Sequence, residues 1–133
     1  MFKKILILTL LLSNSAFGDV TLGYLYGAHI GSNQLNNSHP FLEIDNVIVY
    51  RNSFDKTSIA AFYKENISIF NLRVGITSGY DKYMDYKHAK YENPNILGVS
   101  PFIVPSIEYN TGSVTYVAAL MFNSINIGLG VHF

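Results

Sequence analysis

The segment "SINIGLGVHF" (Ser124–Phe133) alternates between two kinds of residue. The odd-numbered positions are all apolar: Ile125, Ile127, Leu129, Val131 and Phe133. The positions between them are small or polar: Asn126, Gly128, Gly130 and His132. Alternation with a period of two predicts a β-strand with two different faces. A soluble sandwich allows this pattern, and a strand of a membrane barrel fits it at least as well.

The same alternation recurs at the other end of the chain. One face carries Val20, Leu22, Tyr24, Tyr26 and Ile30, while the opposite face carries Gly23, Gly27, His29 and Gly31. His29 is therefore expected to point inward, near the far end of its strand. We predict further strands at about residues 40–45, 47–52, 57–64, 67–78, 98–109 and 113–121. With the first and last segments, the sequence predicts an all-β, eight-stranded antiparallel up-and-down transmembrane β-barrel.

The connections between these strands alternate in length. Short polar segments predict tight turns at Asp45-Asn46, Lys64-Glu65-Asn66 and Asn110-Thr111-Gly112. The other connections include Ser32–His39 and Tyr80–Asn95, which are longer. Because the predicted strand number is even, the tight turns and both chain termini are expected at one end of the barrel, and the longer loops at the other. Short turns at one end and long loops at the other are typical of bacterial outer-membrane barrels.

The first 18 residues are typical of a secretory signal peptide. Lys3-Lys4 precede the apolar run "ILILTLLL", and small residues Ala16 and Gly18 follow. The apolar run is too short to span a bilayer. We expect cleavage after Gly18 and a single barrel domain over residues 19–133. Localisation to the outer membrane of a Gram-negative bacterium follows from an exported barrel of this plan.

Composition excludes several functional classes. Without Lys3 and Lys4 the acidic side chains outnumber the basic ones by two, and no basic patch indicates a nucleic-acid partner. The chain has no cysteine, so neither disulfides nor a thiolate metal site can form. The four histidines, His29, His39, His88 and His132, lack the spacing of metal ligands, and no hydrolase or phosphate-loop motif occurs. We expect no metal and no cofactor. Ten tyrosines and nine phenylalanines suit the interfacial girdles of a bilayer-facing surface.

The predicted topology brings a histidine and a serine to the same end of the barrel. His29 lies at the long-loop end of the first strand, and Asn52-Ser53 lie at the long-loop end of the third. A histidine within reach of a serine hydroxyl is the minimum for general-base activation of a nucleophile. Asp55 is the nearest carboxylate in the sequence and is the candidate to orient the pair. The alternatives are a polar interior residue for His29 and a loop-initiating pair for Asn52-Ser53.

Two further features bear on lipid substrates. Pro101 and Pro105 fall inside the sixth predicted strand and each removes a backbone donor. Either the strand is locally unpaired on one side, or the run is partly loop; a bulge or kink through which no lipid passes is the alternative to a gap. An unpaired side would open a lateral gap through which a lipid chain could pass. The segment Tyr80–Asn95 carries three acids, three lysines and four tyrosines. It is interpreted as a solvated, mobile loop or as a binding segment for phosphorylated sugar head groups.

Several motifs together indicate a resemblance. The segment "YRNSFDK" (Tyr50–Lys56) resembles the stretch Lys-Asp-Ser-Trp-Asn-Lys of PagP-type lipid A palmitoyltransferases, which are eight-stranded outer-membrane enzymes. The likeness continues through four more elements, namely "GITSGY" (Gly75–Tyr80), "PFIVPSIEY" (Pro101–Tyr109), "GSVTY" (Gly112–Tyr116) and the terminal Phe133. It covers most of the chain after residue 18, in order.

The resemblance implies acyl transfer from a membrane phospholipid to lipid A of lipopolysaccharide, or to water. It also implies that the donor chain is held inside the barrel and that lipids enter beside proline-interrupted strands. The essential histidine of the family falls on His29 and its Asp-Ser pair on Asn52-Ser53, so an amide replaces the acid. We assign catalytic roles to His29, Asn52 and Ser53. Contacts with the lipids are assigned to Arg51, Asp55, Tyr80, Pro101 and Pro105.

Two other functions remain open from the sequence. The first is a non-enzymatic small outer-membrane barrel that modifies the cell surface. The second is a soluble periplasmic barrel that binds a lipid in its core, as lipocalins do. In either membrane-bound case we expect a monomer.

Overall fold

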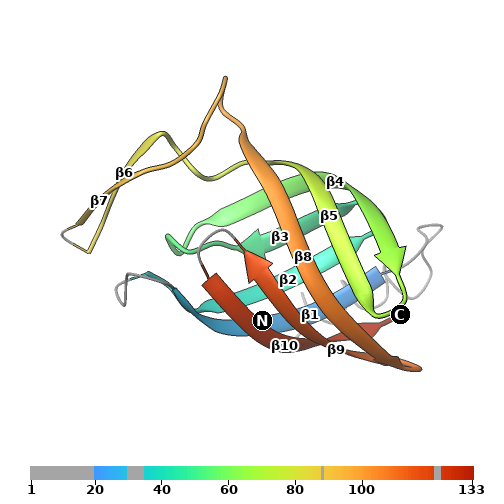
Figure 1. The fold of residues 1–133 in the computed structure, drawn as a ribbon. Helices are drawn as coiled ribbons and strands as arrows, with labels where there is room; N and C mark the ends of the chain where they lie inside the picture. The colour runs from blue at the N-terminus through green and yellow to red at the C-terminus, as the bar shows by residue number, and fades with distance from the viewer. Residues whose placement is uncertain (1–19, 30–34, 88, 122–123) are drawn as a thin grey trace, which may run out of the picture.

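The structure is a computed structural model that describes residues 20–29, 35–87, 89–121 and 124–133. Its main element is a closed barrel of antiparallel strands (Figure 1). The barrel strands are β1 (Val20–His29), β2 (Ser38–Ile44), β3 (Val47–Arg51), β4 (Thr57–Ile67), β5 (Phe70–Thr77), β8 (Ser100–Thr111), β9 (Val114–Met121) and β10 (Ser124–His132). They pair in chain order, and β10 pairs with β1 to close the sheet. The predicted all-β fold with eight antiparallel, up-and-down strands is confirmed. The expected signal peptide lies outside the described residues.

The tight turns lie at one end of the barrel. Asp45-Asn46 joins β2 to β3, as predicted. The backbone N–H of Phe133 donates to the Val20 carbonyl at 2.9 Å, and that of His132 donates to the Ser113 carbonyl at 2.8 Å. These two bonds place the chain end beside the turn that joins β8 to β9. The longest connection lies at the opposite end (Figure 1), as the alternation of loop lengths predicts.

Two of the predicted turns are wrong in position. Residues 64–66 continue β4, and the turn falls on Ser68-Ile69. The turn expected at residues 110–112 falls on Gly112-Ser113. Both actual turns begin with a residue of positive φ, +58° at Ser68 and +70° at Gly112. The asparagines that predicted the earlier positions lie inside paired strands, because the backbone at the turn, and not the polarity of the preceding residues, sets its place.

Side chains alternate between the interior and the outside along every barrel strand. The outward face is largely apolar and exposed. It includes Leu22, Tyr24, Tyr26, Val49, Ile59, Tyr63, Leu72, Val74, Ile76, Ile103, Ile107, Tyr116, Leu120, Ile125, Ile127 and Leu129. The described part of the chain contains no helix long and apolar enough to cross a membrane.

The connection between β5 and β8 is a hairpin. Its strands are β6 (Tyr83–Tyr86) and β7 (Ala89–Glu92), which form a separate two-stranded sheet beyond the end of the barrel (Figure 1). The charged side chains of Tyr80–Asn95 are exposed, as a solvated segment predicts, but the segment is not irregular throughout its described residues. Met84 is buried, and Tyr86 and Tyr91 pack on the apolar core. The mobility of the segment stays a prediction.

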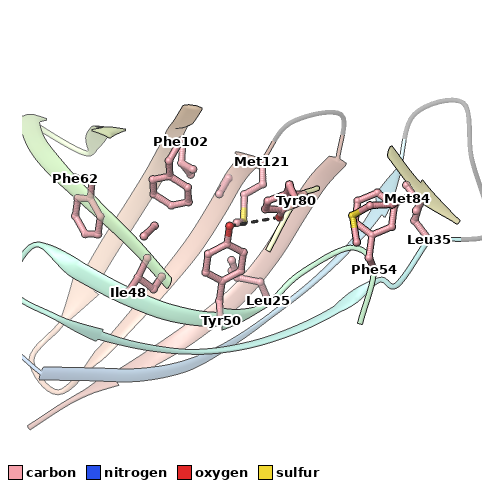
Figure 2. Packing of buried hydrophobic residues seen from close by; sticks show 13 residues of the cluster. Leu25, Leu35, Ile48, Tyr50, Phe54, Phe62, Tyr80, Met84, Phe102 and Met121 are labelled. Carbon is pink, nitrogen blue, oxygen red and sulfur yellow. Dashed lines mark hydrogen bonds between the residues drawn. The ribbon is translucent and has the colours of Figure 1, made fainter. Parts of the chain in front are cut away.

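The buried apolar side chains form two connected groups (Figure 2). Inside the barrel lie Leu25, Ile48, Tyr50, Phe62, Phe102 and Met121. Beside the hairpin lie Leu35, Phe54 and Met84, and Tyr80 lies between the two groups. The Tyr50 hydroxyl, which donates to the Tyr80 hydroxyl at 3.4 Å, joins the barrel interior to the hairpin group.

Charged side chains occupy the interior nearer the turn end. Arg73 donates to Glu43 at 2.9 and 3.1 Å and to Glu108 at 2.8 and 3.4 Å. Lys64 lies 3.7 Å from Glu108. Because every one of these charges is paired, their burial is tolerated. They border a polar cavity of about 500 Å³ that the side chain of His132 also lines.

Candidate functional site

His29 and Ser53 meet at the hairpin end of the barrel. His29 is the last residue of β1 and falls on its inward face, and Ser53 lies in the loop that follows β3. The distance from His29 Nε2 to Ser53 Oγ is 2.8 Å. This distance suits a hydrogen bond in which the serine hydroxyl donates to the imidazole. The structure therefore brings together the two residues that the sequence predicts as nucleophile and base.

Asn37 contacts the other nitrogen of the imidazole. Its side-chain oxygen Oδ1 lies 3.0 Å from His29 Nδ1. An amide oxygen only accepts hydrogen bonds, so the proton of the neutral ring lies on Nδ1 and the lone pair of Nε2 faces Ser53. Ser53, His29 and Asn37 form a chain of the kind that serine and cysteine hydrolases use, with an amide in the third position.

Sequence reasoning missed Asn37. Two adjacent asparagines, Asn36 and Asn37, come just before β2. Which of them points toward His29 depends on the register in which β2 pairs with β1. The backbone N–H of Gly27 donates to the Asn37 carbonyl at 3.1 Å, which extends that pairing beyond the strand. The register, which short strands do not reveal in sequence, thus decides which residue orients the histidine.

Asn36 joins the two segments that carry the site. Its backbone N–H donates to the Ser53 carbonyl at 2.8 Å, and its side-chain Nδ2 donates to the carbonyls of Ser38 and Asn52 at 2.7 and 3.1 Å. His39 Nδ1 lies 2.8 Å from the Arg51 carbonyl, one step further along the same two strands. These bonds fix the backbone of Ser53 against the segment that carries Asn37. The serine and the asparagine thus keep the same position relative to His29.

The side chain of Asn52 makes no hydrogen bond to His29. Its four hydrogen bonds instead hold the loop after β3 in shape. It is 0% exposed, and all four of its hydrogen-bonding positions are used. Nδ2 donates to Ser58 Oγ at 2.9 Å and to the Gly79 carbonyl at 3.0 Å. Oδ1 accepts from the backbone N–H groups of Phe54 at 2.8 Å and Lys56 at 3.1 Å. Two donors and two acceptors are what an amide provides and a carboxylate does not.

Gly79 approaches Asn52 too closely for a side chain. Its φ is +86°, a left-handed conformation that glycine adopts without strain. A Cβ atom at this position would lie 2.4 Å from Ser58 Oγ and 3.0 Å from Asn52 Nδ2. Gly79, the second glycine of "GITSGY", therefore allows this close approach to the loop that carries Ser53.

Arg51 and Asp55 form an ion pair on the surface beside Ser53. Arg51 Nε donates to Asp55 Oδ1 at 2.8 Å, and both side chains are exposed. This hydrogen bond lowers the pKa of the Asp55 carboxyl. The suggestion that Asp55 orients His29 is not supported by this geometry, because Asn37 occupies that place. Arg51 instead faces outward at the end of β3.

Ser53 opens into a cleft between the barrel end and the hairpin. The cleft has a volume of about 370 Å³ and is lined by Leu35, Ser53, Phe54, Tyr80, Tyr91, Glu92, Asn93, Pro94 and Ser100. The Phe54 ring contacts three tyrosines edge to face, with centroids 6.0 Å from Tyr80, 6.0 Å from Tyr86 and 5.3 Å from Tyr91. Burial raises the pKa of the Tyr80 hydroxyl well above its usual value, so this group stays neutral. The rings of Phe54, Tyr80 and Tyr91 thus give the cleft an aromatic surface, and Glu92 is the charged residue among those that line it.

Pro101 and Pro105 face outward on β8. The backbone N–H of Glu108 donates to Ile69, at the β4–β5 turn, so even-numbered N–H groups of β8 point toward β5 and odd-numbered ones toward β9. The two prolines therefore remove donors on the β9 side. In agreement, β8 pairs with β5 from Ser100 to Ile107 but with β9 only from Ser106 onward. The two strands diverge toward the hairpin end (Figure 1).

An apolar hollow lies on the outside of the barrel where the β8–β9 pairing ends. Its volume is about 310 Å³, and Pro105, Ile107, Ala118, Leu120 and Ile125 are among its lining residues. Of the two possibilities that the sequence left open, a strand unpaired on one side is the one observed. Neither proline lies in the cleft that contains Ser53.

The arrangement supports nucleophilic chemistry without a metal ligand set. Within the described ranges, no three His, Asp or Glu side chains gather as a metal site would require. A serine activated by a histidine, beside an aromatic cleft, is suited to attack on the carbonyl of an ester or amide. No family model, no curated protein and no solved structure matches this chain. The PagP-type resemblance therefore remains a prediction from its short motifs.

Proposed function

We propose that the protein is an outer-membrane lipid acyltransferase or phospholipase, in which Ser53 is the nucleophile, His29 the general base and Asn37 the residue that orients the base. The observation that carries this proposal is the contact of 2.8 Å between His29 Nε2 and Ser53 Oγ. The second contact, between His29 Nδ1 and Asn37 Oδ1, supports the proposal because it holds the ring with Nε2 toward Ser53. A PagP-type enzyme with Asn37 in the orienting role is consistent with the motifs in the sequence.

The outer surface of the barrel supports a position in a membrane. Its outward side chains are largely Leu, Ile, Val, Phe and Tyr, whose exposure to water would be unfavourable. A closed barrel satisfies its backbone groups without water, which a bilayer requires. Charged groups such as Arg73 and Glu108 lie inside, as in membrane barrels generally. A soluble lipid-binding barrel has the reverse distribution, and we therefore favour the outer membrane over the periplasm.

The first half-reaction follows from the geometry. Ser53 Oγ attacks the ester carbonyl carbon of a phospholipid while His29 Nε2 takes the hydroxyl proton. The ester C–O bond then breaks, and His29 returns the proton to the leaving glycerol oxygen, which releases a lysophospholipid and leaves an acyl group on Ser53. In the second half-reaction a hydroxyl of lipid A or water attacks the acyl group. His29 takes the proton of that hydroxyl and returns it to Ser53.

The partners in this proposal are membrane phospholipid as donor and lipopolysaccharide or water as acceptor. The exposed Arg51–Asp55 pair beside Ser53 lies where the polar head groups of the outer leaflet would be. An exposed guanidinium is a suitable partner for the phosphates of either lipid. The unpaired edge of β8 beside Pro101 and Pro105 provides a place where lipid can approach the barrel end laterally.

A non-enzymatic surface barrel remains the second candidate because one observation favours it. The barrel interior next to the site is filled by Tyr50, Phe62, Phe102 and Met121, and the resemblance implies an acyl chain in that space. In this case the hairpin β6–β7 would carry the function. The enzyme requires the Ser53 hydroxyl as its nucleophile, whereas the non-enzymatic barrel does not require it.

The test uses the full protein folded in vesicles of phospholipid, with and without lipopolysaccharide, and mass spectrometry of the lipids. We expect a lysophospholipid together with free fatty acid or acylated lipid A, and a loss of roughly 1,000-fold in Ser53→Ala. Ser113→Ala, in an exposed turn at the opposite end, is the matched control. If the folded protein forms no lysophospholipid, or if Ser53→Ala retains full activity, the enzymatic proposal is wrong and the non-enzymatic barrel is favoured.

A further inference from the structure

A second, larger groove lies on the outer wall next to the Ser53 cleft. It has a volume of about 630 Å³, within the range of ligand sites, and lies between the base of the hairpin and strands β5 and β8. Its wall is formed by Ile76 from β5 and by Ser100 and Pro101 from β8. Ile76 and Pro101 are direct partners in the β5–β8 pairing and both are exposed. The groove thus continues the apolar outward face of the barrel.

The groove and the Ser53 cleft share one wall. Glu92, Asn93, Pro94 and Ser100 line both of them. The groove is therefore adjacent to the cleft that contains Ser53. No residue of the outer hollow at Pro105 lines the cleft, so of these two outer-wall cavities the groove is the one that adjoins it.

One lysine stands at the edge of this groove. Lys82 is exposed, and its Nζ atom lies 5.4 Å from the centroid of the Tyr83 ring. It makes no ion pair with any side chain in the part of the chain that the structure describes. Its charge is therefore available to a ligand. The groove is lined mainly by uncharged residues, with Lys82 and Glu92 as its charged ones. A cation beside an apolar surface is complementary to a lipid that joins a phosphate to an acyl chain.

The interior of the barrel is a poor alternative for the chain. Phe102 is 1% exposed and Tyr50 3% exposed, and the rings of Phe62 and Phe102 lie 5.8 Å apart. An acyl chain would have to displace these packed rings, whereas the outer groove is open without any movement.

We propose that the groove between β5, β8 and the hairpin binds the donor phospholipid from outside the barrel, with its phosphate at Lys82 and its acyl chain along Ile76 and Pro101. The ester group, which lies between phosphate and chain, then falls beside the wall that the groove shares with the Ser53 cleft. This inference rests on the proposed function for its consequence in catalysis, but the binding site itself can be tested without any reaction.

Because the chain has no tryptophan, the fluorescence of a single introduced tryptophan reports on its own position alone. Ile76→Trp and Val74→Trp are made separately in a Ser53→Ala background and studied in detergent micelles. Both positions are exposed on the outward face of β5, but only Ile76 lines the groove. The probe is phosphatidylglycerol with brominated acyl chains, which quenches tryptophan on contact. We expect quenching of Ile76→Trp to saturate near one lipid per protein, and quenching of Val74→Trp to rise without saturation.

A third reporter, Phe102→Trp, distinguishes the outer groove from the interior. Saturable quenching there, or equal quenching at positions 74 and 76, overturns the proposal. Phe62→Trp serves the same purpose if Phe102→Trp does not fold. The cation is tested by Lys82→Gln, which we expect to raise the half-saturating lipid concentration several-fold. Lys90→Gln, also exposed on the hairpin but outside the groove, is expected to change nothing.

The consequence for catalysis is tested with two adjacent residues. Ile96 lines the groove and is 76% exposed, whereas Leu97 is 99% exposed and does not line it. We expect Ile96→Asp to lower lysophospholipid formation at least tenfold and Leu97→Asp to leave it unchanged. Equal effects of the two substitutions contradict the role of the groove in catalysis. Saturable binding at Ile76→Trp without any Ser53-dependent cleavage would leave the lipid site intact and remove the proposed enzymatic function.

Discussion

The Asn37 side-chain oxygen lies 3.0 Å from His29 Nδ1, on the side of the ring opposite Ser53. This amide stands where many hydrolases have a carboxylate, and it holds the ring in the tautomer that accepts the serine proton. It orients the base without adding a charge to the site.

The role of Asn37 predicts different effects for two substitutions. Asn37→Ala removes the acceptor, and we expect phospholipid cleavage to fall roughly 100-fold while the protein stays folded. Asn37→Asp keeps an acceptor and adds a negative charge that stabilises the protonated, inactive imidazole. Activity of this variant is expected to persist, with the acid side of its pH–rate profile moved to higher pH. A purely structural role for Asn37 would leave the shape of that profile unchanged.

Asn52 is predicted to be a structural residue, and an acid at this position is expected to be harmful. In Asn52→Asp an oxygen replaces Nδ2 and faces the Gly79 carbonyl at about 3 Å. We expect a loss of about 1–3 kcal/mol in unfolding free energy, because a buried acceptor without a donor is unfavourable. Urea denaturation in micelles measures this loss. Asn66→Asp, on an exposed position of β4, is the control and is expected to be neutral. Higher activity of Asn52→Asp at unchanged stability would show that the missing acid of the PagP-type pattern was catalytic.

The interior ion pairs predict a strong dependence on Arg73. Arg73→Met leaves the carboxylates of Glu43 and Glu108 with Lys64 as their nearest remaining cation. We expect a loss of about 3–5 kcal/mol in unfolding free energy, because an uncompensated buried charge is unfavourable. Arg51→Met breaks an exposed pair with one partner, and solvent screening should leave the unfolding free energy nearly unchanged. Similar losses in the two variants would contradict the paired, buried arrangement.

Phe54 is predicted to hold the hairpin against the barrel. In Phe54→Ala its three ring contacts with tyrosines are lost, and we expect faster hydrogen–deuterium exchange in β6 and β7. Exchange in β1, β9 and β10 should remain as in the unaltered protein. Phe41→Ala, which removes a ring from the polar cavity at the other end, is the control and should leave the hairpin unaffected.

Alternation of side chains was sufficient to predict the barrel. The outward Ile125, Ile127 and Leu129 define the face of β10 without any ambiguity, and each strand of the barrel has such a face. Turn positions were less predictable, because Asn66 looks like a turn residue but lies in a strand. The hairpin was missed since Met84 is buried by contacts across long sequence separations, which a local pattern does not contain.

The site could be predicted in part. His29 and Ser53 follow from strand parity and from the topology that puts both at one end. Asn37 depends on the register of β2 against β1, and one of the four bonds of Asn52 joins it to Gly79 from a distant loop. Neither is visible in the spacing of residues along the chain.

The most direct measurement of the central claim is labelling of the folded protein with a lipid-like fluorophosphonate. Such a reagent bonds its phosphorus to an activated serine oxygen and releases fluoride, and peptide mass spectrometry locates the adduct. We predict an adduct on Ser53 in the unaltered protein and at least a 100-fold slower reaction in His29→Ala. An unlabelled Ser53 in the folded protein, or equal labelling in His29→Ala, would contradict the assignment of Ser53 and His29 as nucleophile and base.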